Sequence, residues 1–147
     1  RITAVSMGNP HCASFIEDVA SLDLSLYGAA IENHSAFPQK TNVEFAQVID
    51  KNTLFMRTWE RNCGETLACG TGCCVATVAG ALTGRCEPKT EVRQLGGIIR
   101  IEWDRASDDL LMTGPSEIVY DGVVDERAAE AFFAAEREAG RKERECI

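Results

Sequence analysis

The chain has little aromatic character, few basic residues and no long hydrophobic run. Aromatic side chains make up 7% of its 147 residues, and 15 lysines and arginines stand against 23 acidic residues, which gives a net charge of −8. The lack of a basic stripe disfavours a surface for nucleic acid or for an anionic membrane. No stretch is long enough to span a membrane, and the first residues do not have the pattern of a signal peptide.

Cysteine is the exception, because the chain contains seven. An odd number is a poor basis for a disulfide framework, and the adjacent Cys73 and Cys74 cannot easily bridge to each other. We therefore expect reduced thiols and a cytoplasmic protein. His11 and the cysteines are potential zinc ligands, but no pair has Cys-x-x-Cys spacing. We expect no metal site.

The spacing of apolar residues predicts an α+β fold in a chain long enough for one domain with a real core. Residues 70–82 carry no charge, which indicates a helix buried on all sides. Around it we expect a curved, mostly antiparallel, barrel-like sheet, with hairpin turns at residues 50–52 and at Gly96-Gly97. The expected strands are residues 1–6, 12–16, 41–49, 53–61, 91–95, 98–103, 110–113 and 117–120.

Two further helices are predicted. Residues 23–33 place Leu24, Tyr27 and Ile31 on one face. Asp125 is a suitable N-cap for a second helix that runs toward the end of the chain. The sequence thus divides into a domain at residues 1–124 and a helical tail at residues 125–147.

Cys69 directly precedes Gly70-Thr71-Gly72 and the start of the predicted buried helix. Unpaired N–H groups in a first helical turn, together with the positive end of the helix dipole, stabilise negative charge. A cysteine at such a place can have a pKa well below the ordinary value of about 8.5. We therefore expect Cys69 to be the reactive thiol of the chain, with a lowered pKa.

Other polar residues suit a zwitterionic amino acid as ligand. N–H groups at a helix start bind carboxylates, and an arginine can bind a second carboxylate through two parallel hydrogen bonds. Asparagine amides can both donate and accept hydrogen bonds. Each feature has a plainer interpretation: Gly-Asn-Pro is common turn chemistry, an asparagine can cap a strand, and adjacent charges on a strand point to opposite faces. The residues expected at this site are Asn9, His11, Asn42, Glu60, Arg61, Cys69, Gly70 and Thr71.

Five motifs, in this order along the chain, resemble the C-terminal half of diaminopimelate epimerase. The lead-in to Cys69 is specific to these epimerases, whereas proline racemases share only the Cys-Gly-Thr-Gly core. Asn62-Cys63 departs from the small residues usual in the family, a change we expect to be tolerated. The motifs are Met7–Cys12, Thr41–Phe45, Trp59–Arg61, Gly64–Gly72 and Met112–Pro115.

The resemblance implies a cofactor-independent epimerase that interconverts LL- and meso-diaminopimelate on the route to lysine and cell-wall peptide. Two cysteines act on opposite faces of the α-carbon, one as thiolate base and the other as thiol acid. By motif, Cys69 is one of these thiols, and His11 and Glu60 assist near the reacting centre. The resemblance places Asn9, Asn42, Glu60, Arg61, Gly70 and Thr71 at substrate-binding positions.

The family's chains are roughly twice as long and have two similar halves, each of which supplies one cysteine. The present chain starts without Met and has no second copy of the motif, so we expect it to be the C-terminal half, inactive without the N-terminal half as partner. A homodimer is left open. Two alternatives remain: a proline or hydroxyproline racemase, which the Glu60-Arg61 pair and the Glu65-Thr66 lead-in disfavour, and a non-catalytic half-domain.

Overall fold

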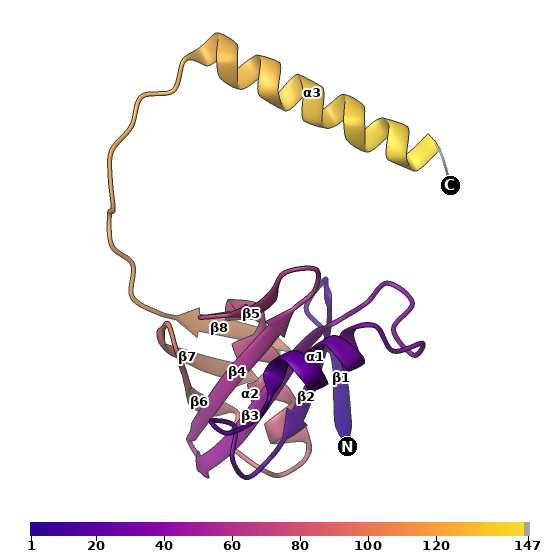
Figure 1. Cartoon of the computed structure of the whole chain (residues 1–147). Coiled ribbons are helices and arrows are strands. Elements are labelled where there is room, and N and C mark those ends of the chain that lie inside the picture. The colour runs from indigo at the N-terminus through magenta and orange to yellow at the C-terminus, as the bar shows by residue number, and fades with distance from the viewer. Residues whose placement is uncertain (146–147) are drawn as a thin grey trace. The chain divides into compact units, whose positions relative to one another are not determined.

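The computed structural model describes residues 1–145 of the chain. It divides into two units, Arg1–Pro115 and Ser116–Ile147, and each is described by itself. The first unit holds the curved sheet and two helices, and the second holds one helix (Figure 1). The elements are β1 Ile2–Ser6, β2 Pro10–Phe15, α1 Leu24–Glu32, β3 Asn42–Asp50, β4 Thr53–Glu60, β5 Gly64–Thr66, α2 Gly70–Leu82, β6 Lys89–Gln94, β7 Gly97–Asp104, β8 Asp109–Thr113 and α3 Glu126–Glu145.

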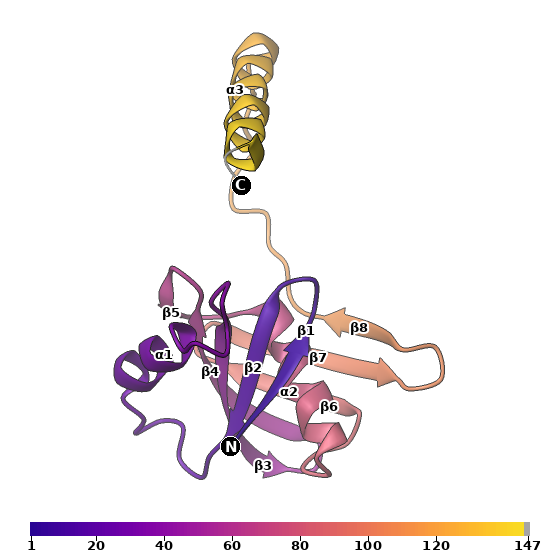
Figure 2. The ribbon, with the colours of Figure 1, turned by 90° about the vertical axis from the view of Figure 1, so that its right-hand side faces the viewer.

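The strands of the described chain form one mixed sheet of eight strands in the order β1-β2-β3-β4-β6-β7-β8, with β5 added beside β4. Five of its pairings are antiparallel and two, β2 with β3 and β4 with β6, are parallel. Figures 1 and 2 show the sheet curled around α2. The predicted fold class is confirmed, and β5 is a strand that the sequence did not indicate.

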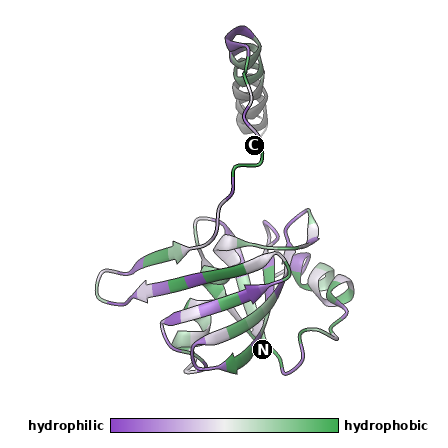
Figure 3. Cartoon of the chain, turned by 90° about the vertical axis from the view of Figure 1, so that its left-hand side faces the viewer, coloured by the Kyte–Doolittle hydropathy of each residue, from purple (hydrophilic) through white to green (hydrophobic). Residues whose placement is uncertain are grey.

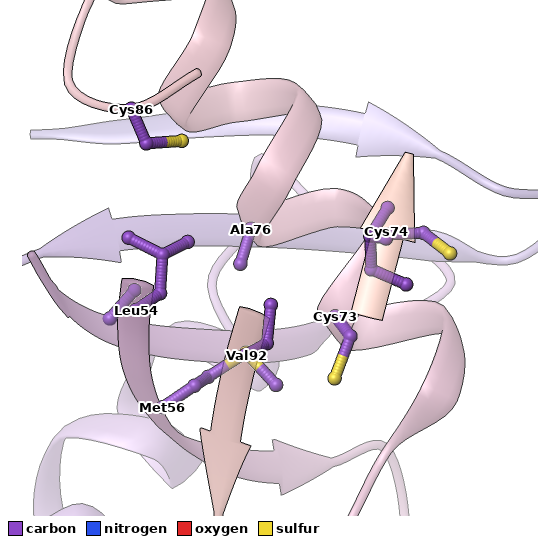
Figure 4. Close-up of a cluster of buried hydrophobic side chains, with 9 residues drawn as sticks. Leu54, Met56, Cys73, Cys74, Ala76, Cys86 and Val92 are labelled. Carbon is purple, nitrogen blue, oxygen red and sulfur yellow. The ribbon is translucent and has the colours of Figure 1, made fainter. Parts of the chain in front are cut away.

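Helix α2 is buried because its sequence offers no polar face. Ten of its residues, from Gly72 to Ala81, are buried, and it contacts β1, β2, β3, β4, β6, β7 and β8. Figure 4 shows Cys73 and Cys74 from this helix in one apolar cluster with Leu54 and Met56 of β4. These two thiols act as small hydrophobic side chains, as their low-polarity surroundings favour. Fully burying one side chain of leucine or methionine size stabilises a fold by about 1.5–3 kcal/mol.

Alternation along the strands separates the two faces of the sheet, and the hydropathy colouring in Figure 3 follows it. In β4, Leu54 and Met56 face α2, whereas Phe55 and Trp59 pack with the cluster beside α1. In β3, Ala46 faces α2, while Val43 and Phe45 face the other way. The central strands are therefore covered on both faces: α2 covers the inner face and α1 covers the outer face.

Helix α1 lies on the outer face of the sheet, where it contacts β3, β4 and β5 (Figure 1). Asp23 caps its start by accepting a hydrogen bond from the Leu26 N–H. The predicted helix is confirmed, but its predicted face is wrong at Tyr27, which is 50% exposed. The buried face instead consists of Leu24, Gly28 and Glu32. The side chain of Trp59 packs directly against the backbone of Gly28, so this side of the helix faces the sheet.

The second unit begins with an extended segment and ends in α3. The strand predicted at residues 117–120 is wrong: Ile118, Val119 and Tyr120 are 83–89% exposed and pair with no described strand. Pro115 lacks the N–H that would extend the ladder of β8 across this point. Asp125 caps α3 by accepting from the Ala128 N–H, as expected. No helix among the described residues is long and apolar enough to cross a membrane.

Candidate active site

Three strands place polar side chains beneath the start of α2. Residues two or four positions along the strand from Ala13, Ala46 or Met56 share their face of the sheet and point toward the helix. Register then aligns them in rows, because His11 of β2 pairs with Asn42 of β3, and Val43 pairs with Trp59. His11, Asn42 and Glu60 thus form one row, and Glu44 and Thr58 stand in the next.

Cys69 is the N-cap of α2 and has the extended backbone that this position requires. Its Sγ accepts from the Gly72 N–H at 3.4 Å and lies 3.5 Å from Thr71 Oγ1. Its own N–H donates to Gln94 Oε1 at 2.7 Å. No hydrogen bond of the described residues uses the N–H groups of Gly70 and Thr71, so these two donors are available to an anion beside the thiol.

The environment of Cys69 raises its pKa. The residue is only 8% exposed, and desolvation is the main cause of the raised pKa. Hydrogen bonds from Thr71 and the Gly72 N–H oppose the rise, whereas the carboxylates of Glu60 and Glu44 add to it. The expectation of a lowered pKa is wrong for this chain, because burial and two acidic neighbours outweigh the helix start.

The amide of Asn42 is fully occupied by the protein. Its Oδ1 accepts from the Arg61 N–H at 2.7 Å, and its Nδ2 donates to Pro10 O and to His11 Nε2, both at 3.3 Å. The Arg61 N–H is a donor only, which fixes the orientation of this amide and makes His11 Nε2 an acceptor. The proton of His11 is therefore on Nδ1, which donates to Glu44 Oε1 at 2.7 Å.

Glu60 and Arg61 lie where β4 turns into β5. Glu60 Oε1 accepts from Thr66 Oγ1 at 2.6 Å, and Arg61 Nη1 donates to Gln39 O at 3.1 Å. Both side chains are half-buried. The buried carboxylate of Glu32, at the end of α1, holds this turn from both sides.

Glu32 makes three contacts around the turn. Its Oε2 accepts from Trp59 Nε1 at 2.7 Å, and its Oε1 accepts from the Asn62 N–H at 2.9 Å. Lys40 Nζ lies 3.4 Å from Oε1. The donors Trp59 and Asn62 lower the pKa of Glu32, and burial opposes them. The carboxylate thus fixes the residues on either side of Glu60 and Arg61.

Asn9 stands at the rim of a hollow of about 510 Å³. No hydrogen bond of the described residues involves its side chain, which is half-buried, so the amide is available to a ligand. The hollow reaches His11 and Gln39, and Gln39 O is the acceptor for Arg61. Its lining residues are Ala4, Val5, Ser6, Gly8, Asn9, Pro10, His11, Phe37 and Gln39.

The structure adds residues that the sequence reading missed. Glu44 lies within the Thr41–Phe45 motif, and its place between two apolar residues of a predicted strand was the signal available in the sequence. Gln94 and Glu32 carried no local signal, because their roles depend on packing between distant segments. Glu65, in the lead-in to Cys69, binds Arg57 with both oxygens at 2.7 and 3.0 Å.

Glu44 and Glu60 lie near the Cys69 thiol, whereas Asn9 and His11 line a hollow to which the thiol does not contribute. The sequence profile described as diaminopimelate epimerase matches residues 3–119. The chain belongs to the diaminopimelate epimerase family. Within it, the chain is 50% identical over 122 residues to the diaminopimelate epimerase of Nostoc punctiforme and 51% identical over 122 residues to that of Moorella thermoacetica.

Each of these two matches covers 83% of the present chain and 44% of the relative. The chain therefore spans less than half the length of these epimerases. A solved structure, a Bacillus anthracis phenazine biosynthesis protein of the PhzF family, shares the fold at 18% identity and a TM-score of 0.52. That match covers 76% of this chain and 37% of the other. The likeness supports the fold alone.

Proposed function

We propose that this chain is the C-terminal half of a cofactor-independent diaminopimelate epimerase, and that Cys69 is one of its two acid–base thiols. Residues 1–124 form the epimerase domain in this proposal, and residues 125–147 form a helical tail. The substrate is LL- or meso-diaminopimelate, on the route to lysine and peptidoglycan. The place of action is the cytoplasm.

One observation carries the proposal: Cys69 caps α2 while the neighbouring N–H groups of Gly70 and Thr71 have no partner among the described residues. A carboxylate held by those two donors places its α-carbon next to the thiol. The same donors stabilise the negative charge that spreads onto the carboxylate when the α-proton leaves. Family membership gives this arrangement its substrate class.

The raised pKa of Cys69 fits the role of proton donor. In our proposal, the thiolate of the partner half removes the α-proton, and the Cys69 thiol delivers a proton to the opposite face of the same carbon. The net change is inversion at that carbon, with the two thiols exchanging protonation states. The reverse reaction uses them in the opposite roles.

The remaining site residues bind and orient the substrate in this proposal. Arg61 and Asn9 face the distal amino-acid end, and Glu60 accepts from an ammonium group. His11 and Asn42 have their ring nitrogens and amide engaged within the protein. We infer that these two residues shape the pocket, and that His11 acts near the reacting centre through Glu44 rather than by direct transfer.

The proposal makes this chain half of a site. Its partner is the N-terminal half of the same enzyme, which supplies the second cysteine, and the isolated chain is inactive. Whether two complete enzymes pair as a homodimer is a separate question for sedimentation analysis. The test of function therefore has to restore the missing half.

A fusion provides that test. The part of the Nostoc punctiforme epimerase that precedes its match to this chain is joined to Arg1, and the product is incubated with LL-diaminopimelate in heavy water. Loss of the α-hydrogen signal and formation of the meso isomer are followed by NMR. We expect activity in the fusion, a drop of at least about a hundredfold in Cys69→Ser, and no activity in the isolated chain.

Cys63→Ser is the matched control, because Cys63 is an exposed cysteine in the same segment. It should keep the activity of the fusion. Proline is the control substrate, and turnover of proline but not of diaminopimelate would replace our proposal by the racemase alternative. A folded fusion that epimerises equally well without Cys69 would refute the role given to this thiol.

A further inference from the structure

Glu44 is a buried acid that lies against the first turn of α2. Its side chain is fully buried, and its Oε1 lies 3.0 Å from where a Cβ on Gly72 would stand. The N–H of this same Gly72 donates to Cys69 Sγ. The carboxyl of Glu44 and the side chain of Cys69 therefore both lie against one residue of the helix, and a side chain at that position would crowd both.

Burial raises the pKa of Glu44, and the hydrogen bond from His11 opposes the rise. His11 Nδ1 donates to Oε1, but His11 Nε2 accepts from Asn42 and so carries no proton. Among the described residues, Oε2 has no hydrogen-bond partner, and neither has the hydroxyl of Thr58, the cross-strand partner of Glu44. When Glu44 is ionised, the nearby positive end of α2 stabilises its charge, and the same part of the helix would stabilise a Cys69 thiolate.

We propose that Glu44 is a positioning residue that occupies the start of α2 in competition with Cys69 and thereby holds this cysteine as the protonated thiol. The inference rests on the proposed function, in which Cys69 delivers a proton to the substrate carbon. A thiol that stays protonated between turnovers is ready for that step. Placing a second negative charge at the same helix start is unfavourable, because like charges at short distance in a buried site repel.

Other ionisable groups also lie near the start of α2 and influence the titration of Cys69. Glu60 acts on Cys69 from β4, and Cys73 and Cys74 lie along α2. Glu44 itself faces His11, Cys12, Glu60, Cys69 and Cys73. Glu44→Gln removes the charge from this set while keeping the acceptor for His11 Nδ1–H, so it isolates the contribution of the carboxylate.

The test is a thiolate titration of the 147-residue chain, followed by absorbance at 240 nm. Subtracting the same titration of Cys69→Ser leaves the signal of Cys69 alone. We expect a midpoint above the ordinary thiol value of about 8.5 in the native chain. In Glu44→Gln the midpoint should fall by about one pH unit, which is about a tenfold larger thiolate fraction at neutral pH.

Glu102→Gln is the matched control, since it removes one acidic charge from the exposed pair with Lys89 on the same sheet. Its midpoint should equal that of the native chain. A native midpoint at or below 8.5, or a midpoint that Glu44→Gln leaves unchanged, overturns the inference. If Glu44→Gln does not fold, Glu44→Asp withdraws the charge by one methylene and must also lower the midpoint; no shift there likewise overturns it.

The readout contains no substrate, so it separates this inference from the proposed function. A chain that shows the shift while its fusion fails to epimerise diaminopimelate would retain the role of Glu44 in holding the thiol protonated and lose the assigned reaction. An active fusion whose titration midpoint does not shift in Glu44→Gln would support the assigned reaction and overturn the role of Glu44.

Discussion

At the scale of single residues, the site depends on polar side chains that bind other parts of the protein rather than solvent. Asn42 joins the ends of three strands through its contacts to Pro10, His11 and Arg61. Glu32 does the same for the turn after β4. Because buried polar groups are costly when a partner is lost, such residues are sensitive to small changes.

Asn42→Ala should lower the free energy of unfolding by about 2–3 kcal/mol, because it leaves buried donors and acceptors of three neighbours unsatisfied. Urea denaturation followed by circular dichroism measures the loss. Asn33→Ala is the control, since the exposed Asn33 amide donates only to Ala29 O. Equal losses in the two variants would show that Asn42 has no special part in joining the strands.

The lowered pKa of Glu32 predicts that the stability of the protein depends on pH. Its pKa is lowered in the folded protein, so the stabilisation by the carboxylate is fully present above the ordinary glutamate value and is lost as the pH falls through the folded value. The stability difference between the native chain and Glu32→Gln should therefore be largest near neutrality and shrink below about pH 4.3. Denaturant titrations at a series of pH values check it, with the exposed Glu17→Gln as reference. A difference that grows in acid would contradict the assignment.

At the scale of elements, α1 shows how packing overrides helix propensity. Alanine is a better helix former than glycine by about 1 kcal/mol, so Gly28→Ala should stabilise an isolated helix. In the protein a Cβ at this position would lie 2.6 Å from Trp59 Cγ. We expect a net loss of about 1–3 kcal/mol from overpacking, measured by thermal unfolding. Leu26→Ala, at an exposed site of the same helix, should change stability by at most about 0.5 kcal/mol. A stabilised Gly28→Ala protein would show that the indole can move aside.

The elements also show what the sequence can predict. Helix α2 was predictable because a 13-residue run without charge is long for a strand, and a helix without a polar face has to be buried. The period-2 strands and the glycine turns were predictable for similarly local reasons. Strand β5 and the contact of Gln94 with Cys69 depend on pairing between distant segments. The raised pKa of Cys69 has the same origin, because the local signal gave the helix start but not the burial or the two nearby carboxylates.

At the scale of the whole molecule, the first unit contains the hydrophobic core of the described residues. All three hydrophobic clusters lie between Val5 and Leu110. A chain that ends at residue 119, where the family match ends, should therefore unfold within about 2 °C of the full chain in a thermal scan. Removal of β8 by ending the chain at residue 108 is the contrasting control and should lower the midpoint. A large drop for the chain that ends at residue 119 would show that the second unit stabilises the first.

The sheet of the first unit ends in strands that pair on one side only within the described chain, β1 and β8. Strand β1 is Ile-Thr-Ala-Val-Ser, with neither a charge nor a proline, and the free edge of such a strand offers a row of unused N–H and C=O groups. An edge of this kind recruits strands from other molecules. Purified at high concentration, the chain should be prone to ordered self-association that a single lysine in β1, for example Thr3→Lys, would suppress. We therefore expect the solubility of the isolated chain to depend on β1, a strand far from Cys69 in sequence.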